Sequence, residues 1–164
     1  MTANTETLLQ PLCDFLESEL KGELERQGHV ATGRLRDSIK VAVLKSANGL
    51  TIEGKGSEIS KYVDWGRKPG GKRVPIQALV GWIQVKGIAS GKRAVQIAWA
   101  VQYSIWKNGI PTNKDEGKKM FVSRTLEKNK DKIFSEVRNF VDGFYNIELS
   151  NIIREVRETN YSKY

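Results

Sequence analysis

The sequence predicts an α+β fold in which helices pack around a small antiparallel sheet. Three observations predict it: leucines at helical spacing near the N-terminus, two alternating segments around Asn48-Gly49, and helical periodicity over most of the chain after Pro75. The 164 residues suffice for one domain with a sizeable core. We expect an α+β domain over residues 1–132 and a long C-terminal helical arm over residues 133–164.

The first predicted element is an N-terminal helix. Between Asn4 and Gln27 the apolar residues recur every three or four positions, with glutamates on much of the other face. Pro11 is tolerated near a first turn, so we expect the regular helix to begin around Gln10. Gly28 is the expected terminator, because glycine readily adopts the left-handed conformation of a helix end.

A short helical turn and a β-hairpin are predicted next. Thr32 is suited to cap a turn whose Leu35 and Ile39 face inward. Alternating segments then flank Asn48-Gly49, and both residues tolerate the positive φ of a tight hairpin turn. We expect a third extended segment over Ser60–Trp65.

The rest of the chain predicts helices separated by breaks. Pro75 suits the first position of one helix, and a second is expected over Lys92–Lys107 before a polar loop at Asn113–Lys119. From Phe121 onward the pattern is helical, with a slip in phase that predicts a bend or break around Gly143–Asn146. The stripe expected to be buried on the Lys92–Lys107 helix consists of Val95, Ala98, Trp99, Gln102 and Ile105 or Trp106.

Charge is unevenly distributed along the chain. Lys and Arg number 27 against 19 Asp and Glu, for a net charge of +8. Residues 1–33 carry −4, residues 34–93 carry +9, and residues 94–164 carry +3. This balance favours acidic partners. The acidic start and basic middle pair either between identical subunits or within one subunit, and the sequence does not distinguish these alternatives.

Several classes of function have little support. Cys13 lies beside Leu12 and Leu16 at helical spacing, which indicates buried packing rather than a reactive thiolate. His29, the one histidine, has no identifiable nucleophile or orienting acid. The glycines match no phosphate-binding loop or dinucleotide fingerprint. No stretch approaches the ~18 apolar residues that span a bilayer. We expect no enzymatic activity, cofactor, metal, membrane partner or small-molecule substrate.

A basic loop is the strongest electrostatic feature. The segment from Arg67 to Arg73 reads Arg-Lys-Pro-Gly-Gly-Lys-Arg and follows Trp65 directly. Cations beside an aromatic ring hold nucleic acid by phosphate contact and stacking. The same charges suit an acidic protein face. Alternatively, the loop is a solvated turn whose charges only contribute to solubility. The residues expected to contact a partner or DNA are Trp65, Arg67, Lys68, Lys72 and Arg73.

Aromatic and aliphatic side chains suggest docking surfaces. Most of the four tryptophans are expected in the core, with Trp82 and Trp106 half-exposed at the margins of their stripes. The C-terminal arm carries too many apolar residues for a solvated helix, so it either folds back or docks on another subunit. The residues expected to dock are Phe140, Phe144, Tyr145, Leu149, Ile152, Ile153 and Val156.

The order of these segments resembles the head–tail connector, neck or tail-completion proteins of tailed bacteriophages. The resemblance rests on Thr32-Gly33-Arg34-Leu35-Arg36-Asp37-Ser38-Ile39 after the first helix, on Tyr62-Val63-Asp64-Trp65-Gly66 after the hairpin, and on Gly109-Ile110-Pro111 followed by Phe121-Val122. It covers roughly residues 8–132.

The resemblance implies a structural role in the virion, at the head–tail junction, with host cytoplasm as the site of assembly. It implies a homo-oligomeric ring between portal or adaptor proteins and tail proteins, with possible contact to packaged DNA. It nominates Lys40–Lys55 and Arg67–Arg73 as contacts and supplies no catalytic residue. The alternative function is a stand-alone nucleic-acid-binding domain that uses the basic middle segment.

Overall fold

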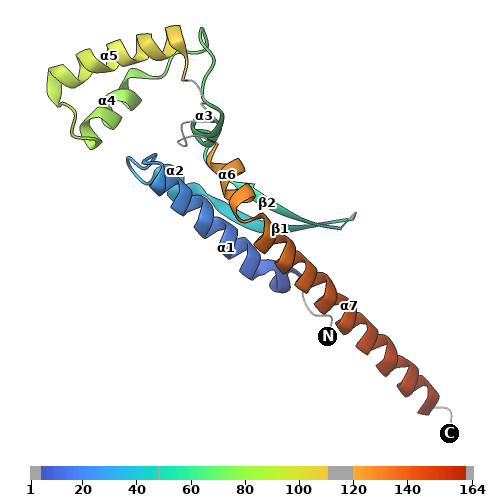
Figure 1. Cartoon of the computed structure of the whole chain (residues 1–164). Helices are drawn as coiled ribbons and strands as arrows, with labels where there is room; N and C mark the ends of the chain where they lie inside the picture. The colour runs from blue at the N-terminus through green and yellow to red at the C-terminus, as the bar shows by residue number, and fades with distance from the viewer. Residues whose placement is uncertain (1–4, 48, 111–119, 162–164) are drawn as a thin grey trace.

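A computed structural model describes residues 5–47, 49–110 and 120–161. Asn48 of the predicted turn, Pro111 of the quoted motif and the predicted loop Asn113–Lys119 lie outside these residues. Helices and one two-stranded antiparallel sheet make up the described chain, which confirms the α+β prediction (Figure 1). The elements are α1 (Thr5–Arg26), α2 (Arg34–Ser38), β1 (Lys40–Ser46), β2 (Gly49–Lys55), α3 (Ser60–Trp65), α4 (Ile76–Val85), α5 (Gly91–Asn108), α6 (Phe121–Lys128) and α7 (Lys130–Tyr161).

Helix α1 begins earlier than predicted and ends as predicted. It starts at Thr5 and runs through Pro11, because one proline removes a single backbone hydrogen bond while Leu9, Leu12 and their neighbours remain buried. At the other end Gly28 has φ +70°. The N–H groups of Gly28 and His29 donate to the carbonyls of Glu25 and Leu24 at 2.9 and 3.0 Å, a Schellman ending.

The hairpin packs on α1 and forms the main hydrophobic core. Strands β1 and β2 pair from Lys40 opposite Lys55 to Ser46 opposite Gly49, so the predicted hairpin is confirmed. The buried members of this core are Leu12, Cys13, Leu16, Leu20, Leu24, Ile39, Val41 and Phe121. Cys13 is therefore a packed core thiol, as predicted.

The short helix α2 lies between α1 and the hairpin, and residues of the segment Thr32–Ile39 hold it in place by hydrogen bonds. Gly33 precedes it with φ +77°. The predicted cap, Thr32, accepts a long hydrogen bond of 3.5 Å from the Arg34 N–H. The Ser38 hydroxyl donates to the Leu35 carbonyl at 2.7 Å and accepts from the Ser57 N–H at 2.9 Å. Ser38 thus ties the entry of the hairpin to its exit.

The prediction of an extended segment at Ser60–Trp65 is wrong, because these residues form helix α3. Its β-branched and aromatic residues favour a strand locally. The helical conformation instead places Asp64 inside the protein, where its carboxylate accepts a hydrogen bond of 3.0 Å from the Val122 N–H in the first turn of α6. A tertiary helix cap thus overrides local propensity.

Helices α4 and α5 form an antiparallel pair with a second, smaller core, set apart from the hairpin (Figure 1). Pro75 precedes α4 as its N-cap instead of occupying its first position. The buried residues of α5 are Ala94, Ala98 and Gln102. The predicted burial of Val95 and Trp99 is wrong: small alanines let α5 approach α4 closely, which leaves the larger side chains outside.

The expectation that most tryptophans belong to the core is also wrong. Trp65 and Trp99 are 74% and 55% exposed, and Trp82 and Trp106 are the half-exposed residues that were predicted. Helix α5 has apolar residues on two sides, and its small residues occupy the side that packs. All four tryptophans are therefore at least 36% exposed.

Helix α7 is continuous from Lys130 to Tyr161, so the predicted break around Gly143–Asn146 is wrong. Figure 1 shows no bend there. The interruption lies at Asn129, between α6 and α7, where the side-chain amide donates to Glu19 of α1 at 3.2 Å. The slip in apolar phase around Gly143–Asn146 occurs within one continuous helix, whose apolar residues move from one side to another at this point.

The C-terminal arm projects from the molecule and does not fold back. Near its start, Ile133 packs on the main core and the Lys132 ammonium lies 3.5 Å from the centre of the Phe15 ring. Helix α7 then runs past the start of α1 into solvent (Figure 1). At 32 residues it is about 48 Å long. No described side chain of α7 is buried.

Candidate functional site

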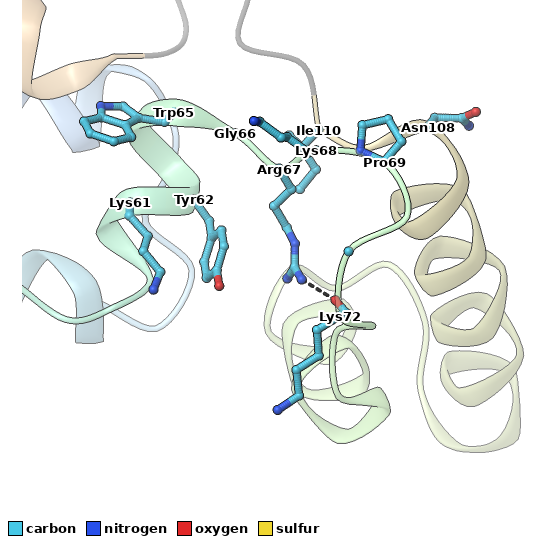
Figure 2. A pocket seen from close by; sticks show the side chains of 11 residues that line it. Lys61, Tyr62, Trp65, Gly66, Arg67, Lys68, Pro69, Lys72, Asn108 and Ile110 are labelled. Carbon is cyan, nitrogen blue, oxygen red and sulfur yellow. Dashed lines mark hydrogen bonds between the residues drawn. The ribbon is translucent and has the colours of Figure 1, made fainter.

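The predicted basic loop forms one side of an open cleft between α3 and the C-terminal end of α5 (Figure 2). The cleft has a volume of about 710 Å³. Its lining residues are Lys61, Tyr62, Trp65, Gly66, Arg67, Lys68, Pro69, Gly71, Lys72, Asn108 and Ile110. Four of these side chains are cationic and none is acidic.

Backbone contacts hold the loop against the end of α5. Arg67 and Ile110 exchange two N–H to carbonyl hydrogen bonds of 2.9 Å, and the Gly70 N–H donates to the Trp106 carbonyl at 2.7 Å. Gly109 lies at the contact with φ +71°, and a Cβ there would lie 2.3 Å from the Arg67 carbonyl oxygen. Only glycine allows this approach.

Two contacts hold the guanidinium of Arg67 beside the cleft. Its guanidinium carbon lies 4.6 Å from the centre of the Tyr62 ring, and its Nη2 donates to the Lys72 carbonyl (Figure 2). Lys61 approaches the same ring at 5.1 Å. Tyr62 thus holds two cations beside the cleft by cation–π attraction.

The structure brings four of the five predicted contact residues into this cleft: Trp65, Arg67, Lys68 and Lys72. Arg73 is separated from it and lies 5.1 Å from the centre of the Trp106 ring, in an adjoining shallow pocket. Lys61, Tyr62 and Asn108 were not predicted as contacts. The Tyr62 motif was visible in the sequence, but an extended segment would have pointed Lys61 and Tyr62 to opposite faces.

Among the described residues, the cations of the cleft form no salt bridge with an acid. None of the salt bridges among the described residues involves the Arg67–Arg73 loop or Lys61. The acids of α1, by contrast, are paired within the subunit: Glu17 with Lys21 and Lys40, and Glu25 with Arg36. These pairs neutralise much of the acidic start of the chain within the subunit.

The arrangement suits an extended anion with flat groups beside its charges. Four cations attract phosphates or carboxylates, and the exposed Trp65 ring offers a stacking surface at the rim. Cys13 belongs to the core, where burial raises the pKa of its thiol, with a smaller contribution from Asp14. His29 follows α1 and is not among the lining residues.

The predicted docking residues of the arm lie on α7, away from the cleft (Figure 1). Phe140 and Phe144 stack on each other with ring centres 6.2 Å apart and are partly buried. The remaining five are exposed: Tyr145, Leu149, Ile152, Ile153 and Val156. The molecule therefore presents two separate candidate surfaces, one basic and one apolar.

Comparison with family models, curated proteins and solved structures finds no significant match for the chain. Within the described residues, no group of three or more His, Cys, Asp or Glu side chains is placed to hold a metal ion. No described helix combines the length and apolar character needed to cross a membrane.

Proposed function

We propose that the chain is a structural protein of the tailed-phage head–tail junction, which joins copies of itself in a ring between portal or adaptor proteins and the tail. The observation that carries this proposal is α7, an exposed helix of 32 residues whose outer half presents apolar side chains to solvent. Exposed apolar surface of this extent is typical of a subunit whose neighbours cover it. The role is mechanical and non-enzymatic.

Several residues that carry the resemblance to connector proteins make contacts that hold the elements of this fold together. Ser38 ties the two ends of the hairpin together, and Asp64 caps α6. Gly109 permits the contact between the basic loop and α5. These contacts position a hairpin, a helical pair and a helical arm as three projections from one body, which suits a subunit that contacts several neighbours.

Particle assembly tests this proposal. In a phage that encodes this chain, removing it is expected to leave heads and tails that do not join, and adding the purified chain is expected to restore joining. A chain with Leu149→Glu and Ile152→Glu should fold and fail to restore it. Leu8→Glu, a charge added at an exposed leucine of α1, is the matched control. Normal particles formed without the chain would contradict the proposal.

A stand-alone nucleic-acid-binding domain is the second candidate, favoured by the four cations that line the cleft with Trp65. For such a domain, affinity for DNA falls with salt at a log–log slope of about −0.9 for each phosphate contacted. Replacing Arg67, Lys68, Lys72 and Arg73 by Ala would abolish tight binding without affecting particle assembly. A connector subunit binds DNA weakly, and its assembly depends on α7.

A further inference from the structure

Helix α5 and helix α7 each carry an apolar stripe that is exposed among the described residues. The stripe of α5 consists of Val95, Trp99, Tyr103 and Trp106, which are 36–55% exposed. That of α7 consists of Tyr145, Leu149, Ile152 and Val156, which are 54–68% exposed. Residues at these spacings share one side of a helix.

The two stripes match in length. Successive residues are four, four and three positions apart on α5, and four, three and four positions apart on α7. In both stripes the last residue therefore lies 11 positions after the first, or about 17 Å along the helix axis. The α5 stripe is mostly aromatic and the α7 stripe mostly aliphatic, so large rings on one helix can pack between branched side chains on the other.

Charges at the margins of the stripes are opposite in sign. Lys92 lies three residues before Val95, and Lys107 lies four residues after Tyr103, so both border the α5 stripe. No residue of α5 is acidic.

On α7 the bordering residues are acidic. Asp142 lies three residues before Tyr145, and Glu148 lies four residues before Ile152. Lys92, Lys107, Asp142 and Glu148 take part in none of the salt bridges found among the described residues. A basic border on one stripe and an acidic border on the other favour their mutual contact.

The stripes of one molecule lie too far apart to meet. Helices α4 and α5 occupy one end of the molecule, and the outer half of α7 projects from the opposite end (Figure 1). Contact between them therefore requires two copies of the chain. Such a contact joins different surfaces on the two copies, and repetition closes it into a ring when the rotation between copies allows.

We propose that the α7 stripe of one copy docks on the α5 stripe of the next copy. This inference rests on the proposed function as a ring-forming subunit and names the surfaces that would join the ring. The aromatic side chains Trp99 and Tyr103 anchor the contact at its centre. The bordering lysines and acids favour contact between α5 and α7, and they disfavour pairing of α5 with α5 or of α7 with α7.

Mixing two variants tests this pairing. The first carries Trp99→Glu and Tyr103→Glu on α5, and the second carries Leu149→Glu and Ile152→Glu on α7. All four side chains are exposed, so circular dichroism should show both variants folded. In sedimentation velocity the wild-type chain should associate and each variant alone should be monomeric. The mixture should form a one-to-one dimer, because one intact α5 stripe then meets one intact α7 stripe.

Each other outcome has a definite meaning. An α5 variant that still self-associates, with no dimer in the mixture, would overturn the proposal in favour of α7 pairing with itself. An α7 variant that still self-associates, with no dimer in the mixture, would overturn the proposal in favour of α5 pairing with itself. If both variants associate as the wild type does, the two stripes do not form the contact, and the proposed ring would use other surfaces. A wild-type chain that stays monomeric up to its solubility limit would contradict the proposed function itself.

A milder set of variants separates loss of contact from loss of folding. Lys92→Glu with Lys107→Glu should weaken association, and so should Asp142→Lys with Glu148→Lys. Combining all four substitutions in one chain should restore association, since each border then meets a border of opposite charge. Failure of that restoration, with all variants folded, would show that these charges do not face one another. The control is Leu8→Glu, which should associate as the wild type does.

Discussion

Arg67 and Ile110 exchange a pair of backbone hydrogen bonds of 2.9 Å, which fastens the basic loop to the chain segment leaving α5. This bridge joins the two connections that run between the main body and the α4–α5 pair. It holds one wall of the cleft in place, so the position of Arg67, Lys68 and Lys72 depends on it.

Gly109→Ala should disrupt this bridge. The glycine has φ +71° and ψ −168°, a conformation that only glycine adopts readily, and the added Cβ would lie 2.3 Å from the Arg67 carbonyl oxygen. We expect a loss of at least about 2 kcal/mol in the free energy of unfolding, measured by urea denaturation. Gly81→Ala is the matched control: it lies inside α4 with open space around it and should be neutral or stabilising. Equal effects of the two substitutions would refute this role of Gly109.

Asp64 should stabilise the junction of α3 and α6 as a buried helix cap. Replacing it with Ala leaves the Val122 N–H without its 3.0 Å acceptor, at a cost of about 1 to 2 kcal/mol. Asp64→Asn keeps a side-chain oxygen in that place and should cost less. Thermal unfolding of both variants measures the difference, and an Asn variant that is less stable than the Ala variant would argue against capping.

Glu17 should make stability depend on acid pH. The hydrogen bond from Lys21, with those from Lys40 and the Val41 N–H, lowers the pKa of Glu17 from 4.5 to about 2, against the opposing effect of burial. A carboxylate whose pKa is lowered by folding stabilises the protein above its unfolded pKa, and this stabilisation is lost as the pH falls from about 4.5 towards about 2. Glu17→Gln should flatten the stability profile in that range.

The control for this pH profile is Glu58→Gln, which removes an exposed carboxylate that makes none of the salt bridges among the described residues. Its profile between pH 4.5 and about 2 should follow that of the wild type. An unchanged profile for Glu17→Gln would show that the contacts of Glu17 with Lys21, Lys40 and β1 do not persist in solution.

Cys13 should react only when the core opens. Its side chain is fully buried, and burial raises the pKa of the thiol, which lowers the fraction of reactive thiolate. We expect alkylation in the native protein to be slower than in urea by a factor that follows the free energy of unfolding. Equally fast alkylation of native and unfolded chains would contradict the packing of α1 on the hairpin.

Local patterns were enough to predict α1, the hairpin and the arm. Leucines at helical spacing and Asn48-Gly49 between alternating segments are short-range signals that the tertiary structure preserves. Helix α3 could not be predicted in this way, because its aromatic and β-branched residues favour a strand. Its helical form depends on the cap that Asp64 provides to α6. The two residues of this hydrogen bond, Asp64 and Val122, are 58 positions apart in the chain.

The basic cleft was predictable only in part. The cations of the loop and Trp65 are visible in the sequence, whereas the contribution of Lys61 and Tyr62 follows from the helical form of α3. Helix α5 posed a different problem, because apolar residues occupy two of its sides. Hydrophobicity favoured Trp99 for the core, but close approach to α4 required Ala94 and Ala98 instead.

Neighbouring subunits are proposed to cover the apolar surfaces of this chain in an assembled particle. Cryo-electron microscopy of purified virions can show whether they do. We expect density for the chain repeated around the axis of the head–tail junction, with the outer half of α7 packed against an adjacent subunit. Particles that lack the chain, or that hold it with α7 exposed to solvent, would rule out this role.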